Sequence, residues 1–123
     1  MIFQDNVIDN MNNFKNLHIW VSSMSLVMDI YDLVKKVNQA EKFGLIDQIK
    51  RSCVSIPSNI AEGSSRTSIK EFQRFLNISL GSAFKLETQL ILVKKLYDIE
   101  SKEIFSALSV LQKQIHSFKK CLK

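Results

Sequence analysis

The sequence predicts an all-α fold, an antiparallel up-down-up-down four-helix bundle, and three observations support this prediction. Apolar residues recur at intervals of three and four through most of the chain, as they do on the buried faces of helices. Glycine and proline are scarce, at three and one in 123 residues, which favours long helices with few connections. Three short polar links separate four periodic stretches, and short links make successive helices antiparallel.

The chain divides into a short extension and one helical domain. Residues 1–12 lack a helical pattern, so we expect a flexible N-terminal extension. Asn13, Ser68 and Ser101 each precede a periodic stretch and are expected to cap it; Ser68 with Glu71 matches a capping box. Gly63 is expected to end the second helix. The domain spans 13–123, with predicted helices at 13–37, 41–62, 68–97 and 101–122.

The first predicted helix carries two apolar stripes, although a helix that packs into one core needs only one. The second stripe predicts a further buried surface and therefore self-association. The first stripe holds Leu17, Trp20, Met24, Val27 and Tyr31, and the second holds Ile19, Leu26, Ile30, Leu33 and Val37.

Two features of the second and third helices predict how these helices pack. Pro57 interrupts the second helix, but the apolar spacing continues to Ile60, so a kink is expected rather than an end. A patch of small residues in the third helix would let another helix approach closely, and it contains Ser79, Gly81, Ser82 and Ala83.

The formal charge of +5 is compatible with an acidic partner such as nucleic acid, and equally with a charge that only maintains solubility. Basic residues gather around the second and third helices, where a helix N-terminus also favours anions. The candidate phosphate contacts are Lys50, Arg51, Arg66, Lys70 and Arg74. The alternative is a solvated face paired with Asp47 and Glu71. Lys113, Lys119, Lys120 and Lys123 are interpreted as a solubilising face.

No pattern of catalytic or metal-binding residues stands out, so neither an enzyme nor a metal or other cofactor is expected. His18 and His116 have no ligand partner three or four residues away, and Cys53 lies on an apolar stripe, as buried inert thiols do. Asn59, Glu62 and Glu87 lie beside apolar stripes. They could form a ligand or catalytic site, but a hydrogen-bonded network that fixes helix register is the favoured interpretation.

Nothing in the sequence predicts a membrane protein or an exported one. The longest uncharged stretch, Leu17 to Met28, is too short and too polar to span a bilayer. The first residues show no basic region followed by an apolar segment, as a signal peptide would. Two distant cysteines without metal or redox spacing fit a reducing compartment, and a cytoplasmic location is expected.

Several strings of residues, in this order, resemble one protein family over roughly residues 14–122. The most specific is SIPSNIAEG at 55–63, and Leu17 with Trp20 resembles the family's N-terminal Leu-x-x-Trp signature. The other strings are EKFGLIDQIKR at 41–51, EFQRFL at 71–76 and GSAFKLETQL at 81–90. The chain is similar to the 23S ribosomal RNA intervening-sequence proteins, also called the four-helix bundle protein family.

The resemblance implies a bacterial antiparallel bundle that assembles into a ring-like homopentamer, often encoded within insertions of ribosomal RNA genes. The family is also similar to the accessory variability protein of diversity-generating retroelements, a basic pentamer that binds nucleic acid and a reverse transcriptase. Lys85 stands where the family has an acidic residue, which favours a basic, nucleic-acid-facing surface.

These observations predict a non-enzymatic oligomeric protein that associates with ribosomal RNA or similar nucleic acid through a basic surface. The alternative is a protein-interaction scaffold without direct nucleic-acid contact. An enzyme is the third hypothesis, and it would require Asn59, Glu62 and Glu87 to converge in an open pocket.

Overall fold

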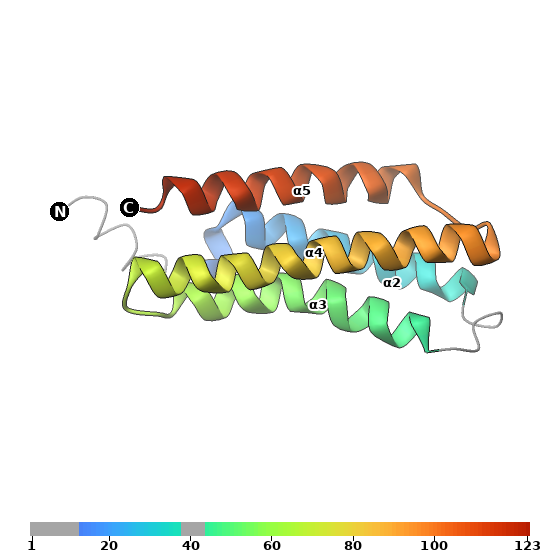
Figure 1. Cartoon of the computed structure of the whole chain (residues 1–123), viewed down its shortest axis with the longest axis horizontal. Coiled ribbons are helices and arrows are strands. Elements are labelled where there is room, and N and C mark those ends of the chain that lie inside the picture. The colour runs from blue at the N-terminus through green and yellow to red at the C-terminus, as the bar shows by residue number, and fades with distance from the viewer. Residues whose placement is uncertain (1–12, 38–43) are drawn as a thin grey trace.

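The computed structural model describes residues 13–37 and 44–123, and within these ranges every regular element is helical. Figure 1 shows the long helices lying lengthwise alongside one another, with the α3–α4 link at one end and the α4–α5 link at the other. The main contacts join α2 to α3, α3 to α4, α4 to α5 and α5 to α2, so the helices enclose one core. The elements are the 3₁₀ turn η1 (Phe14–Asn16), α2 (His18–Val37), α3 (Leu45–Ser64), α4 (Ile69–Tyr97) and α5 (Lys102–Cys121).

The core consists of one apolar stripe from each of the four long helices. These stripes follow the three- and four-residue spacing of the sequence, which puts their side chains on one face of each helix. Fully enclosed members are Ile30 of α2, Ile49 of α3, Leu86 of α4 and Ile115 of α5. Within the described helices, none is long and apolar enough to cross a membrane.

The two serine caps predicted from the sequence are confirmed. The Ser68 hydroxyl accepts a hydrogen bond from the Glu71 backbone N–H at 3.1 Å, and Ser101 accepts one from Ile104 at 3.2 Å. Asn13 makes no side-chain cap. The chain instead forms η1, extends at buried Leu17 and enters α2 at His18, five residues later than the predicted start.

Gly63 differs from its prediction, because it lies inside α3 rather than ending it. The described glycine with a positive φ is Gly44, which precedes α3. Gly63 is instead required by close packing, since a Cβ at this position would lie 2.6 Å from the Cβ of Phe75. The predicted extension at 1–12 and the predicted break and helix start at 38–43 lie outside the described residues.

Hydroxyl groups join α3 to α4 beside Pro57, through which α3 continues as predicted. Ser79 donates to the carbonyl of Ile56 at 2.9 Å, and the hydroxyls of Ser55 and Ser82 lie 2.8 Å apart. Both bonds require close helix approach, which small residues permit. Ser79 and Ser82 of the small-residue patch therefore pack on α3, whereas Gly81 faces open space.

The two stripes of α2 have different surroundings. The stripe that contains Leu26 and Ile30 is buried throughout. In the other stripe Leu17 is buried, but Met24 and Tyr31 remain 41% and 37% exposed in the single chain. The helix thus carries apolar surface that its own bundle does not cover.

Candidate nucleic-acid interface

The α3–α4 turn positions three of the five predicted phosphate contacts. Arg66 lies in the link between the helices, while Lys70 and Arg74 lie in the first two turns of α4. The link is held by the backbone N–H of Arg66, which donates to the Gly63 carbonyl at 3.1 Å. Because the helices approach closely at Gly63, the side chain of Arg66 comes within reach of α4.

Two guanidinium groups lie close to the ring of Phe75. The guanidinium of Arg66 is 4.8 Å from the centre of the Phe75 ring, and that of Arg74 is 4.6 Å from it. A planar cation over an aromatic ring is attracted by the electrons of the ring face. The Nε atom of Arg66 is buried in this stack and has no hydrogen-bond acceptor among the described residues.

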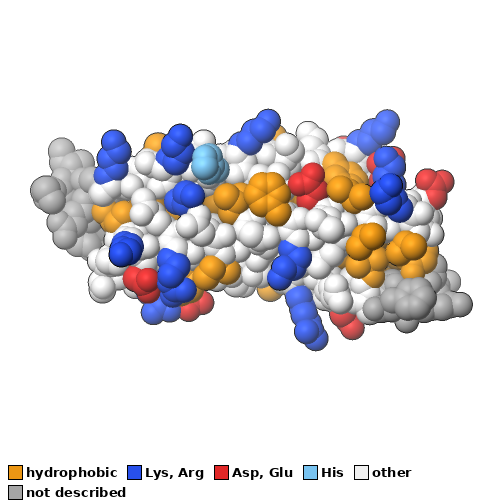
Figure 2. All heavy atoms as spheres, in the orientation of Figure 1, with side chains coloured by type: hydrophobic (Ala, Val, Ile, Leu, Met, Phe, Trp, Pro, Cys, Tyr) orange, Lys and Arg blue, Asp and Glu red, His pale blue; other side chains and the backbone are white. Residues whose placement is uncertain are grey.

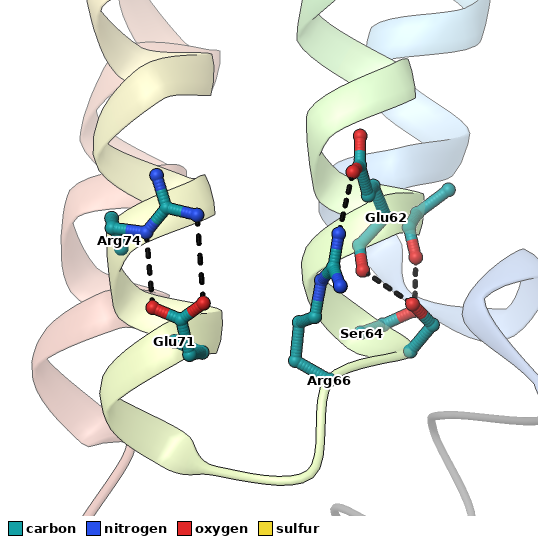
Figure 3. Close-up of polar contacts among 7 residues, drawn as sticks. Glu62, Ser64, Arg66, Glu71 and Arg74 are labelled. Carbon is teal, nitrogen blue, oxygen red and sulfur yellow. Dashed lines mark hydrogen bonds and ion pairs between the residues drawn. The ribbon is translucent and has the colours of Figure 1, made fainter.

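A glutamate neutralises each of these arginines, as Figure 3 shows. Arg66 donates to Glu62 at 2.7 Å, and the Nε of Arg74 donates to Glu71 at 3.0 Å. The hydrogen bond from Arg74 lowers the pKa of Glu71, and the same bond raises the pKa of Arg74. A phosphate that binds these arginines must therefore compete with a carboxylate.

Lys50 and Arg51 do not belong to the same cluster. Arg51 lies 13 residues before Ser64, the last residue of α3, which is about 20 Å along a helix at 1.5 Å per residue. The ammonium group of Lys50 lies 5.2 Å from the centre of the Tyr31 ring of α2. The five predicted contacts therefore occupy two separate regions.

Lysines at the end of α5 and just beyond it join the cluster at the α3–α4 turn, and the sequence pattern alone did not assign them to it. Gln73 of α4 donates to the carbonyls of Lys119 and Leu122, at 3.2 and 2.9 Å, and Lys119 donates to Asn77 at 2.9 Å. These bonds hold the end of α5 against the start of α4. We call the combined surface the basic end, and it consists of Arg66, Lys70, Arg74, Lys119, Lys120 and Lys123.

Charge is unevenly matched across the basic end. Glu62 and Glu71 form ion pairs with its arginines. Lys70, Lys120 and Lys123 make no ion pair with any described residue. Figure 2 shows lysine and arginine side chains along α5 and around the α3–α4 turn. A signal for this surface exists in the sequence, since residues 104–123 contain no aspartate or glutamate.

The polar residues Asn59, Glu62 and Glu87 contact different partners. Asn59 donates to the backbone carbonyl and the hydroxyl of Ser55, at 2.8 and 2.9 Å. Glu62 pairs with Arg66, and Glu87 accepts a hydrogen bond from Gln112 of α5 at 2.9 Å. Across residues 13–37 and 44–123, no hydrogen bond joins any two of the three.

The described residues provide little for covalent or metal chemistry. They contain no group of three or more His, Cys, Asp or Glu side chains that could hold a metal ion. Cys53 is buried, and burial raises the pKa of its thiol from 9.0 to about 11. The geometry thus supports a charged binding surface better than a reactive centre.

Comparison with known proteins identifies similar sequences and structures. The model of the family described as 23S rRNA-intervening sequence protein matches residues 15–120. A crystal structure of a protein of unknown function from the S23 ribosomal protein family of Bacteroides thetaiotaomicron VPI-5482 superposes with a TM-score of 0.76. The two sequences are 29% identical, and the match covers 83% of this chain and 98% of the other. No curated protein sequence matches the chain.

Proposed function

Because the chain belongs to the 23S rRNA-intervening sequence protein family, we propose that it is a non-enzymatic bundle protein that associates with ribosomal RNA or similar nucleic acid. The observation that carries this proposal is the basic end, where three helix termini bring six cations together against two carboxylates. Phosphate contacts of this kind give affinity and position without reading base sequence.

The lysines and arginines of the basic end contribute differently to this binding. Lys70, Lys120 and Lys123 have no ion-pair partner to displace within the described chain, so phosphates gain the full interaction with them. Arg66 and Arg74 are held beside Phe75, and their glutamates weaken phosphate binding there. Lys50 and Arg51 would extend the contact along α3.

The proposal includes the assembly and setting that the family resemblance implies. The chain would be an antiparallel subunit of a ring-like homopentamer in a bacterial cytoplasm, with a relation to the accessory variability protein of diversity-generating retroelements. Helix links at alternating ends of the molecule support the antiparallel arrangement (Figure 1). The exposed apolar residues of α2 support self-association.

Salt titration of binding to structured ribosomal RNA tests the nucleic-acid proposal. If five of the six cations of the basic end contact phosphates, the log–log slope should be about −4.5, which is a roughly 10²–10³-fold loss of affinity between 50 and 200 mM salt. Replacing Lys70 and Lys120 by glutamine should reduce the magnitude of the slope by about 0.9 per lysine. Replacing Lys35 and Lys36, exposed in the last turn of α2, is the matched control.

Two outcomes would contradict the proposal. Binding without salt dependence would show that phosphates are not contacted. Equal losses in the Lys35 and Lys36 control would show that net charge, rather than the basic end, determines affinity.

The second candidate is a protein-interaction scaffold in which the charge is incidental. The observation that favours it is the set of apolar side chains left exposed on α4, which includes Phe84 at 53% and Leu96 at 58%. Affinity purification with and without nuclease distinguishes the two. A defined protein partner retained after nuclease treatment supports the scaffold, and loss of all partners supports nucleic-acid binding.

A further inference from the structure

A hollow of about 480 Å³ lies between the start of α2 and the second half of α5. Its lining contains none of the residues of the basic end, so the proposed function does not use it. The residues that α5 contributes recur at intervals of three and four, which places them on one face of the helix. The volume falls within the range of roughly 300–1,000 Å³ that pockets for small ligands occupy.

The floor of the hollow is apolar. Ile19 of α2 is only 3% exposed, and Phe118 of α5 is partly buried against the core. The Phe118 ring meets the ring of Phe72 edge to face, with 5.7 Å between the ring centres, so its position is fixed by the bundle. A ligand that covers this floor would remove apolar surface from water, which favours a ligand with a hydrocarbon part.

The rim of the hollow favours an anion. The amide nitrogen of Gln114 lies 3.2 Å from Nε2 of His18. An amide nitrogen can only donate, so Nε2 accepts, and the proton of the neutral ring is on Nδ1, where it can be donated to a ligand. Lys113 is exposed and makes no ion pair with any described residue. No aspartate or glutamate is among the described residues that line the hollow.

The size of the hollow favours a small molecule over a protein partner. A stable protein interface takes about 20–30 residues from each side, whereas the large apolar side chains here are Ile19, Val110 and Phe118. The hollow is also elongated along α5. Cys121 lies eight residues after Lys113, which is about 12 Å at 1.5 Å per residue. An unbranched chain with its charged end at Lys113 fits this length.

We propose that the hollow binds a medium-chain alkyl carboxylate. Its carboxylate accepts hydrogen bonds from the Lys113 ammonium group and the His18 Nδ1–H, and its chain lies over Ile19 and Phe118 toward Cys121. An alkyl ammonium would place like charge beside Lys113, and an alcohol would gain burial without an ion pair. This binding depends neither on nucleic acid nor on self-association.

Isothermal titration calorimetry with three probes of equal chain length tests the ligand class. Decanoate should bind in a saturable manner, below the concentration at which it forms micelles. Decanol should bind more weakly, and decylammonium at least roughly tenfold more weakly than decanoate, because its charge meets that of Lys113. Octanoate should bind more weakly than decanoate by about fourfold per methylene removed, as the burial of a CH₂ group predicts.

The thiol of Cys121 reports whether the ligand occupies this hollow. Cys121 is exposed and lines the hollow, so a neutral disulfide reagent reaches it in the free protein. Saturating decanoate should slow its labelling by at least roughly fivefold, because the bound chain covers the sulfur. This measurement uses the parent chain and needs no variant that could fail to fold.

Two substitutions test the contacts, each with a matched control. Lys113→Gln should weaken decanoate by about three- to tenfold and leave decanol unchanged, because an exposed ion pair is lost. Lys35→Gln, at an exposed position on α2, should change neither. Ser117→Glu adds a carboxylate to the hollow within reach of Lys113 and should abolish decanoate binding. Ser106→Glu, exposed on α5 outside the hollow, should preserve it. Circular dichroism checks the helix content of each variant.

The other outcomes overturn the proposal. Lack of saturable decanoate binding would refute the site, and equal binding of decylammonium would refute selection of an anion. Decanoate binding that leaves the labelling of Cys121 unchanged, or that survives Ser117→Glu, would place the ligand elsewhere. Equal losses in Ser106→Glu would show that net charge alone determines the affinity.

Discussion

At the scale of single residues, Phe75 organises the α3–α4 turn. Its Cβ lies against the backbone of Gly63, and the guanidinium groups of Arg66 and Arg74 both lie close to the centre of its ring, at 4.8 and 4.6 Å. Phe75 as a whole is only 6% exposed. One aromatic residue thus links the tight packing of α3 on α4 with the position of the cations at the basic end.

Gly63→Ala should destabilise the protein by about 1–2 kcal/mol, because the added methyl group overlaps Phe75 and both backbones are fixed by helix packing. Gly81→Ala is the matched control, since a Cβ there meets nothing within 4 Å and alanine favours the helix by about 1 kcal/mol. Urea unfolding measures both. Equal stabilisation by the two substitutions would show that Gly63 is not closely packed.

Glu71 should titrate below the ordinary value of 4.5, because the hydrogen bond from Arg74 favours the charged carboxylate and lowers its pKa. The ion pair of Glu71 with Arg74 therefore stabilises the fold fully above the pKa that Glu71 has in the unfolded chain. This stabilisation is lost as the pH falls through the lower pKa that Glu71 has in the folded chain. Carboxyl NMR titration of Arg74→Gln should return the pKa of Glu71 toward 4.5.

Glu103 provides an internal control for this titration. Its pKa is lowered first by its own backbone N–H and then by the Ser101 hydroxyl, so Arg74→Gln should leave it lowered. A shift of both carboxyls in the variant would indicate a general change of fold rather than loss of one hydrogen bond.

At the scale of elements, the helix ends differ in how far the sequence determines them. Ser68 and Ser101 cap α4 and α5 through hydrogen bonds to residues three positions on, so the pattern is local and readable. The start of α2 instead follows Leu17, which has an extended backbone and is buried in the core that the helices share. The helix therefore begins at His18 rather than at the predicted Asn13, because Leu17 packs into the core.

Ser101→Ala should cost about 1 kcal/mol, because the Ile104 N–H at the start of α5 loses its side-chain acceptor. Ser106→Ala, at an exposed position inside the same helix, should be neutral or slightly stabilising, since alanine is the better helix former. Thermal unfolding of the two variants measures the difference. A similar effect in both would mean that the cap contributes no stability.

At the scale of the whole molecule, the three- and four-residue spacing of apolar residues predicted all four helices and most of the core. Stripe members such as Ile56, Leu90 and Leu111 are at most 2% exposed. The basic end was only partly predicted, because Lys119, Lys120 and Lys123 are distant in sequence from Arg66. Hydrogen bonds from Gln73 bring these regions together, and nothing local in the sequence encodes that contact.

The closed core should be visible in thiol chemistry. Cys121 is exposed and Cys53 is buried, with burial raising the pKa of the Cys53 thiol to about 11. Because the thiolate is the reactive form, a disulfide reagent at pH 8 should label Cys121 rapidly and Cys53 only after unfolding. Rapid labelling of Cys53 in a Cys121→Ser variant would show that the bundle opens readily.

The sequence by itself determined the helical class, the four helices, the serine caps and the apolar surplus of α2, because each follows from intervals within one helix. Only the tertiary structure decided why Gly63 is glycine, which cations share one surface, and where the surplus apolar residues are exposed. These properties depend on distances between residues of different helices. The helical repeat determines which face of its helix a residue occupies. The packing of the helices determines which residues of other helices contact that face.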